Sequence, residues 1–195
     1  MSESPEIVVL RRADYRRMRW KNGAGWTTEI AQAAAGDGGF AWRVSIAEVD
    51  ADGDFSAFPG VDRSLLVLSG EGMALDFGTG ATTLVRPLAD AAVFAGEAAI
   101  YARLLGGPTR DFNVMTRRDR YAHRLTLRGP GEPMGLVRDS TRSWLVHVLA
   151  GAVAGVSAGD SFLLGEGPEA TLELAGDATL VIVGLQRLGD SISGA

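Results

Sequence analysis

Apolar segments of this chain are short, and glycine breaks them at close intervals. The chain contains 26 glycines among 195 residues, whereas glycine makes up about 7% of an average globular protein. No Gly-X-Y period is present, so these glycines are not those of a collagen helix. They stand between short apolar runs, where a β protein needs tight turns. This spacing leaves little room for long helices and predicts an all-β fold.

The segment Phe40–Val49 shows the strand pattern most clearly, because its side chains alternate with period two. One predicted face carries Trp42, Val44 and Ile46, and the other carries Arg43, Ser45 and Ala47. An arginine on the second face predicts water or a lined cavity there.

Similar patterns predict the remaining elements. We expect one helical turn at Ala13–Met18, a tight turn at Asn22-Gly23 and a linker at Gly129–Met134. Further strands are expected at Ile7–Leu10, Trp26–Ala31, Ser64–Leu68, Ala74–Phe77, Thr82–Val85, Ala91–Phe94, Ala99–Leu105, Phe112–Met115, Tyr121–Leu127, Trp144–Leu149, Val153–Val156, Ser161–Leu164, Ala170–Leu174 and Thr179–Leu185.

A faint internal repeat predicts two fused barrels. The stretch Arg63–Gly70 resembles Arg142–Gly151 if two residues are inserted, and both are followed by an Asp, a Phe and a Gly-Glu pair. A period of about 80 residues is too long for a solenoid and suits a duplicated small barrel, whose closure removes exposed strand edges. The expected domains are residues 1–128 and 135–195, packed as one compact unit.

Charge and cysteine content exclude several classes of protein. The net charge of −5 and the pI near 5.1 argue against a nucleic-acid partner. The basic stretch Arg11–Lys21 is read as a solvated face, because no recognition-helix or zinc pattern accompanies it. Without cysteine the chain can form no disulfide, thiolate zinc site or iron–sulfur cluster.

Membrane and targeting signals are not found either. The longest mostly apolar stretch, Trp144–Val156, falls short of the roughly 20 residues that cross a bilayer. The first residues show no secretory signal pattern. We therefore expect a cytoplasmic protein without a membrane partner.

The same sequence predicts no metal and no cofactor. His123 and His147 are the only histidines, and they are not at metal-ligand spacing. The stretch Phe58–Arg63, leading into Val67–Gly72, looks like the first motif of a cupin without its histidines.

Four stretches together resemble the HutD/Ves family. The most distinctive is Trp20-Lys21-Asn22-Gly23-Ala24-Gly25-Trp26, within Arg19–Ile30, and the others are Trp42–Val49, Phe55–Arg63 and Arg110–Met115. They occur in the expected order over about the first 115 residues. Ala24 is a departure, since the family often has a third glycine there.

The resemblance implies a double-stranded β-helix of the RmlC-like cupin type, duplicated as a bicupin. It also implies a link to histidine utilisation, in which HutD-type proteins are thought to bind a pathway metabolite and limit flux, with no established catalysis.

The residues of these stretches supply the chemistry of a binding pocket. Two arginines, Arg43 and Arg63, can each hold a carboxylate through two hydrogen bonds. Asp111 is expected to orient an arginine. The polar or charged remainder is Lys21, Asn22, Asn113, Ser45 and Glu48, and the flat apolar walls are Trp20, Trp26 and Phe58. This set suits a small anionic metabolite with a nitrogen-bearing group.

Structural roles for the same residues stay open. Asn22 can be a turn residue with no role in binding, and the aromatic side chains can belong to the core. Arg43 and Arg63 can form structural ion pairs with Glu48, Asp62 or Asp111.

Three functions are compatible with this sequence. The leading hypothesis is a binding protein that regulates or limits histidine catabolism by sensing urocanate or a formimino- or formyl-glutamate. The alternative is a metal-independent isomerase or hydrolase that uses Glu48 or His147 as base. The third is an interaction module that uses the basic stretch Arg11–Lys21. A homodimer is left open.

Overall fold

The structure is a computed structural model that describes residues 5–21, 23–89 and 91–189. Among these residues there is one 3-10 helix, η1 (Arg12–Asp14), and no α-helix. The strands are β1 (Val8–Leu10), β2 (Arg16–Arg19), β3 (Gly25–Ala34), β4 (Phe40–Val49), β5 (Gly53–Asp54), β6 (Val61–Ser69), β7 (Met73–Asp76), β8 (Thr82–Val85), β9 (Ala92–Ala95), β10 (Tyr101–Leu104), β11 (Thr109–Arg117), β12 (Tyr121–Arg128), β13 (Met134–Arg138), β14 (Arg142–Ala150), β15 (Ala152–Val153), β16 (Val156–Ser157), β17 (Ser161–Leu164), β18 (Ala170–Leu174) and β19 (Thr179–Arg187). The predicted all-β class is confirmed.

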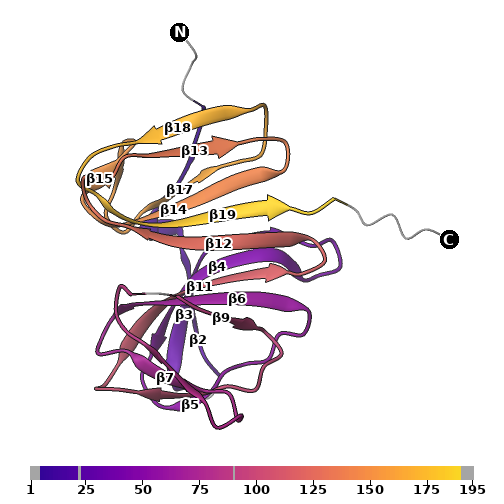
Figure 1. Ribbon diagram of the computed structural model, residues 1–195, viewed down its shortest axis with the longest axis vertical. Coiled ribbons are helices and arrows are strands. Elements are labelled where there is room, and N and C mark those ends of the chain that lie inside the picture. The colour runs from indigo at the N-terminus through magenta and orange to yellow at the C-terminus, as the bar shows by residue number, and fades with distance from the viewer. Residues whose placement is uncertain (1–4, 22, 90, 190–195) are drawn as a thin grey trace, which may run out of the picture. The chain divides into compact units, whose positions relative to one another are not determined.

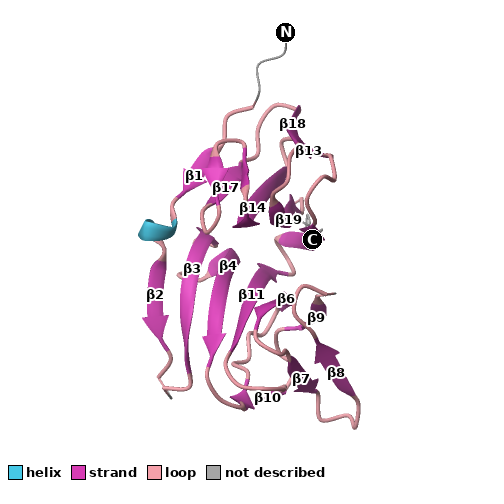
Figure 2. Ribbon diagram, turned by 90° about the vertical axis from the view of Figure 1, so that its left-hand side faces the viewer, coloured by secondary structure: helices cyan, strands magenta, loops and turns pink. Residues whose placement is uncertain are grey.

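The chain forms two compact units. The N unit is Tyr15–Arg118, and the C unit combines Met1–Asp14 with Asp119–Ala195. This division differs from the expected boundary between residues 128 and 135. The reason is long-range pairing: β12 pairs along its whole length with β19 (Figure 1), and β1 pairs with β17 (Figure 2).

The N unit contains two sheets. The larger has the order β2-β3-β4-β11-β6-β9, and the smaller has the order β5-β10-β7-β8 (Figure 2). Their inward side chains form one core, with Leu65 and Val67 from the larger sheet and Met73 and Leu75 from the smaller. All four are fully buried. A buried side chain of this kind stabilises the fold by about 1.5–3 kcal/mol.

The three central strands of the larger sheet place polar residues on this inward face. On β11, Asn113 lies opposite Ser45 of β4, and Met115 lies between Arg43 of β4 and Arg63 of β6. Directly paired residues in an antiparallel sheet share a face. The face predicted for Arg43, Ser45 and Ala47 is therefore the inner one.

The C unit has a five-stranded sheet with the order β1-β17-β14-β19-β12, and two small sheets, β13-β18 and β15-β16. Its core includes Val146, Phe162, Leu180 and Ile182, none of which is exposed. Trp144, partly buried, packs against this core and donates from Nε1 to the Val137 carbonyl at 2.8 Å.

The strand pairings of the two units repeat. β4 pairs with β11 as β12 pairs with β19, and β6 lies between β11 and β9 as β14 lies between β19 and β17. The pair β5-β10 recurs as β13-β18, and β7-β8 recurs as β15-β16. β6 and β14 have 9 residues each, and glycines with positive φ, Gly70 and Gly151, follow them. The two strands thus align without the expected insertion, so the counterpart of Arg63 is Trp144 and not Arg142.

The second half of the segment expected to form a helical turn at Ala13–Met18 is strand. Only Arg12–Asp14 is helical, and β2 then pairs residue by residue with β3, from Arg16 with Glu29 to Arg19 with Trp26. Pairing with a neighbouring strand has overridden local preference here. In the following turn Gly23 has a φ of 75° and donates to the Trp20 carbonyl at 3.0 Å. Asn22 lies outside the described residues.

Candidate functional site

The interior of the N unit holds a charged side chain, Arg63, that is only 5% exposed. Its Nη2 donates to Asn113 Oδ1 at 2.9 Å, and its Nη1 donates to the Ser56 carbonyl at 3.4 Å. Its Nε has no hydrogen-bond partner. Burial lowers the pKa of Arg63, but an arginine stays protonated at neutral pH. These two bonds thus use two of the five N–H donors of the guanidinium, and neither involves Nε.

Three phenyl rings surround the Arg63 guanidinium. Its Cζ lies 5.2 Å from the ring centre of Phe55, 5.5 Å from that of Phe58 and 5.0 Å from that of Phe94. Ring faces attract a cation and exclude water from it. Phe58, predicted as a pocket wall, therefore contacts the arginine that it was expected to accompany.

Asp111 completes a relay that begins at Arg63. It is 1% exposed, and its Oδ1 accepts a hydrogen bond from Asn113 Nδ2, whereas its Oδ2 has no partner. Burial raises the pKa of Asp111 to about 7, although Arg63 and the bond from Asn113 act in the opposite direction. A carboxyl group near half-protonation at neutral pH can accept or donate a proton.

A second arginine lies on the same face of the sheet. Arg43 Nε donates to Glu29 Oε2 at 2.8 Å, and the side chains of this ion pair are only 18% and 14% exposed. Ser45 lies between Arg43 and the core residue Ala47 along β4 and is buried. We call Glu29, Arg43, Ser45, Arg63, Asp111 and Asn113 the Arg63 cluster.

The structure separates other predicted site residues from this cluster. Trp26 and Glu48 are direct partners across β3 and β4, and they occupy the opposite face of the sheet. There, Arg17 lies 4.3 Å from the Trp26 ring centre and pairs with Glu48 at 2.6 Å. Lys21 is exposed. Trp20 packs against the N-unit core and donates to Thr27 Oγ1 at 2.8 Å.

The predicted ion-pair alternatives also differ from the pairs observed. Arg43 pairs with Glu29, which was not among the predicted site residues, and Asp62 pairs with Arg118 at 2.8 Å. The second base candidate, His147, belongs to the C unit, where its Nδ1 lies 2.9 Å from Ser161 Oγ.

The C unit shows which side chains this fold accepts at the three positions of the Arg63–Asn113–Asp111 relay. Trp144 lies at the strand position of Arg63, since they pair with the equivalent residues Gly184 and Met115. By the same register, Leu180 occupies the position of Asp111 and Ile182 that of Asn113. Both are fully buried. The fold therefore accepts apolar side chains at all three positions, and packing alone does not explain the Arg63–Asn113–Asp111 relay.

No group of three or more His, Cys, Asp or Glu side chains within residues 5–21, 23–89 and 91–189 is arranged to hold a metal ion. No helix in this part of the chain is long and apolar enough to cross a membrane.

Comparison with known proteins gives one family. The model of the HutD family matches residues 12–188. The chain is 43% identical over 121 residues to an uncharacterised 21.2 kDa protein in the hutC 3′ region of Pseudomonas putida, covering 62% of this chain and 63% of that protein. It is 40% identical over 111 residues to protein Ves of Citrobacter koseri, covering 55% of this chain and 58% of that protein. The matches thus span less than two thirds of each relative.

Solved structures show the same similarity over nearly the whole chain. HutD from Pseudomonas fluorescens SBW25 superposes with a TM-score of 0.83 at 32% identity, covering 94% of this chain and 100% of that one. YhhW from Escherichia coli superposes with a TM-score of 0.65 at 10% identity, covering 94% of this chain and 98% of that one, which shows the fold alone. The predicted cupin-like fold is confirmed.

Proposed function

The chain belongs to the HutD family, which is linked to the histidine-utilisation locus, and we propose that it binds a small anionic metabolite inside the N unit. The Arg63 cluster is the proposed binding site. Binding would regulate or limit histidine catabolism, with urocanate or a formimino- or formyl-glutamate as the ligand. We place this activity in the cytoplasm and assign no nucleic-acid partner.

One observation carries this proposal: Arg63 Nε and Asp111 Oδ2 are both buried and lack a hydrogen-bond partner. Leaving a buried polar atom unpaired costs about 1–3 kcal/mol. At the equivalent strand positions the C unit has Trp144 and Leu180, which avoid that cost, and its buried unpaired atom, Arg138 Nε, lies on another strand, β13. A ligand carboxylate that accepts from Arg63 Nε and from a protonated Asp111 Oδ2 would satisfy both atoms. Urocanate and the acylated glutamates each carry a carboxylate.

The test is calorimetry with urocanate and N-formylglutamate. A ligand with micromolar affinity, present at millimolar concentration, should stabilise the protein by about 4 kcal/mol and raise its melting temperature by roughly 8–16 °C. Arg63→Lys should weaken binding roughly 10- to 150-fold, because an ammonium group keeps the charge but loses the fork. Arg103→Ala is the control, since Arg103 is exposed and its partners among the described residues are Asp76 and the Tyr101 ring.

Two results would refute the proposal. If no pathway acid shifts the melting temperature at millimolar concentration, the link to histidine catabolites fails. If Arg63→Lys binds as tightly as the parent, the fork is not the anchor.

A second candidate function, a metal-independent isomerase or hydrolase, is favoured by the pKa of Asp111. A buried carboxyl group with a pKa of about 7 suits general acid–base catalysis near neutral pH. Proton NMR in D₂O would detect solvent exchange or product formation with each pathway acid, and Asp111→Asn should abolish it. If a ligand binds but its spectrum does not change, the enzymatic function is refuted.

A further inference from the structure

The two arginines of the Arg63 cluster differ in their partners. Arg63 has no carboxylate within ion-pair distance among the described residues and instead uses an amide and a backbone carbonyl. Arg43 already has a carboxylate, Glu29, at 2.8 Å. Arg63 therefore lacks an anionic partner among the described residues, whereas Arg43 is paired with the carboxylate of Glu29.

An irregularity in β3 positions Glu29 for this contact. Glu29 lies opposite Ser45, but the register then shifts, so that Ala31 lies opposite Val44 and Gln32 opposite Arg43. This β-bulge adds a residue to β3 next to Glu29. Bulges bend a strand and re-aim its side chains, and they recur beside functional sites. The Glu29 carboxylate reaches diagonally across the strands to Arg43, a distance that long side chains bridge.

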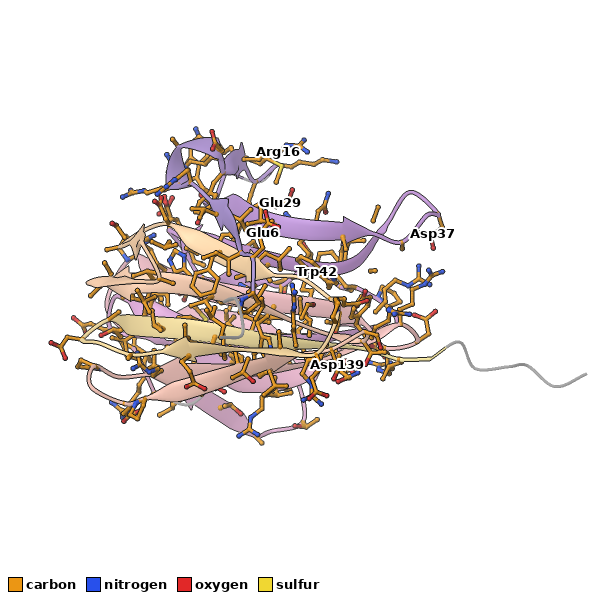
Figure 3. All side chains as sticks on the ribbon, turned by 90° about the horizontal axis from the view of Figure 1, so that it is seen from above. Glu6, Arg16, Glu29, Asp37, Trp42 and Asp139 are labelled. Carbon is orange, nitrogen blue, oxygen red and sulfur yellow. The ribbon has the colours of Figure 1, made fainter. Side chains whose placement is uncertain are left out.

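Glu29 also has a second cation beside it. Arg16 of the edge strand β2 is its direct cross-strand partner, and Figure 3 labels both residues. Arg16 is exposed and makes no ion pair with another described residue. Direct cross-strand neighbours are close enough for opposite charges to pair. Glu29 can therefore leave Arg43 without losing a cationic neighbour.

We infer that the ligand of the N unit is a dicarboxylate, and that its second carboxylate displaces Glu29 from Arg43 while the first binds Arg63. This inference rests on the proposed function and specifies its ligand class. Arg43 and Arg63 flank β11 at Met115, one strand on each side. Neighbouring strands lie about 4.8 Å apart, so the two Cα atoms are separated by roughly 10 Å. Side chains converging from that separation can hold the two ends of one small molecule.

This exchange would make the Arg43 end of the site selective for a carboxylate, although Arg43 is already paired in the unliganded protein. A carboxylate that replaces Glu29 restores the charge-assisted bond on Arg43, and Glu29 then faces Arg16 and water. A ligand with a neutral group at that end cannot replace an ionised carboxylate, so Glu29 stays on Arg43. Glu29 is thus a positioning and specificity residue, and the intact Arg43–Glu29 pair disfavours monocarboxylates relative to dicarboxylates.

The test uses two probes of nearly equal size, N-formylglutamate and N-formylglutamine, which differ by one carboxylate. The parent protein should bind the dicarboxylate at least about tenfold more tightly. Glu29→Gln should strengthen dicarboxylate binding about tenfold, because Arg43 is then free. Glu29→Asp should act in the same direction, since the shorter side chain withdraws its carboxylate from Arg43, and it supplies the answer if Glu29→Gln does not fold.

A double-mutant cycle separates displacement from simple repulsion. In an Arg43→Gln background, Glu29→Gln should have no effect on dicarboxylate affinity, because no cation is left to compete for. If Glu29→Gln still strengthens binding there, Glu29 acts only by repelling anions and the inference is overturned.

Other outcomes separate this inference from the proposed function. Equal affinity for the two probes, or unchanged or weaker dicarboxylate binding in Glu29→Gln, overturns the dicarboxylate assignment alone, provided that Arg63→Lys still weakens binding. Tight binding of urocanate with neither glutamate probe bound does the same. If neither these probes nor urocanate binds the parent protein, both proposals fail.

Discussion

At the scale of single residues, the proton on Asp111 controls what the Arg63 cluster can bind. When Asp111 is ionised it repels an anionic ligand, and when it is protonated its hydroxyl can donate to that ligand. Because burial raises the pKa of Asp111 to about 7, both forms are present at neutral pH. An anion that prefers the protonated form should be taken up together with a proton.

We therefore expect the affinity for carboxylate ligands to fall as the pH rises through about 7, by at most about tenfold per pH unit. In Asp111→Asn this dependence should flatten between pH 6 and 8 (roughly the range around that pKa), because an amide does not titrate. Calorimetry over this range is the measurement. A parent protein with pH-independent affinity would show that Asp111 does not face the ligand.

The same proton has an effect on stability, whose direction follows from the raised pKa. Asp111 in the folded state binds its proton more tightly than in the unfolded chain, where its usual value is 3.8. Its contribution is therefore complete below about pH 4 and is lost as the pH rises through about 7. The melting temperature of Asp111→Asn, relative to the parent, should increase from pH 5 to pH 8. A constant difference across these pH values would contradict the assignment.

Much of the cluster was readable from residue types and alternation. The period of β4 put Arg43 and Ser45 on one face, and the same alternation continued by two residues puts Glu48 with Ile46 on the other. The sequence thus contained the reason for excluding Glu48. Glu29 was missed for a physical reason, because its contact with Arg43 depends on a β-bulge that the local sequence pattern does not predict.

At the scale of elements, the start of β3 depends on a close approach of two backbones. A Cβ added at Gly25 would lie 2.2 Å from the Glu48 carbonyl oxygen and 3.2 Å from the Trp20 ring. The backbone of β4 cannot move away without breaking its pairing with β11. Gly25 within the family motif is therefore required by packing and not by a positive φ.

Gly25→Ala should accordingly destabilise the N unit by at least about 1–3 kcal/mol, the usual cost of overpacking a core. Thermal and denaturant unfolding measure this. Gly53→Ala is the matched control, because a Cβ there meets nothing within 4 Å and Gly53 needs no positive φ. If both variants unfold alike, the contact with Glu48 is not what fixes this glycine.

The sequence predicted whether a segment is a strand better than it predicted the sheet or unit to which that strand belongs. Period two and the glycine turns located β4 exactly where it lies, because one buried face makes a strong pattern. β2 was missed, since its charged residues carry no strand pattern and its structure comes from pairing with β3. The assignment of β12 to the C unit likewise depends on β19, far away in the sequence.

At the scale of the whole molecule, the two units can be compared with each other, because both are built from the same strand pairings. They share strand order and register, including a register shift near the same end of the central pair, at Arg110/Asp111 and at Val148/Ala150. Only one of them buries a charged relay at the centre of its large sheet. A core built from this topology is therefore stable without that relay, and the N unit retains it at a cost.

That cost is measurable in a variant carrying Arg63→Met, Asp111→Leu and Asn113→Ile, the last two copied from the C unit. Replacing a buried charged network by apolar residues of similar volume is often neutral or stabilises a protein by about 1–4 kcal/mol. Methionine suits position 63 because its thioether packs well against Phe55, Phe58 and Phe94. We expect an unchanged or higher free energy of unfolding, measured by chemical denaturation, together with complete loss of ligand binding.

The matched reverse change, Ile182→Asn in the C unit, should lower the free energy of unfolding, because its buried amide lacks the arginine and carboxyl partners that Asn113 has. A triple variant that is clearly less stable than the parent would mean that the relay holds the N unit together, and the unpaired atoms would then no longer point to a ligand.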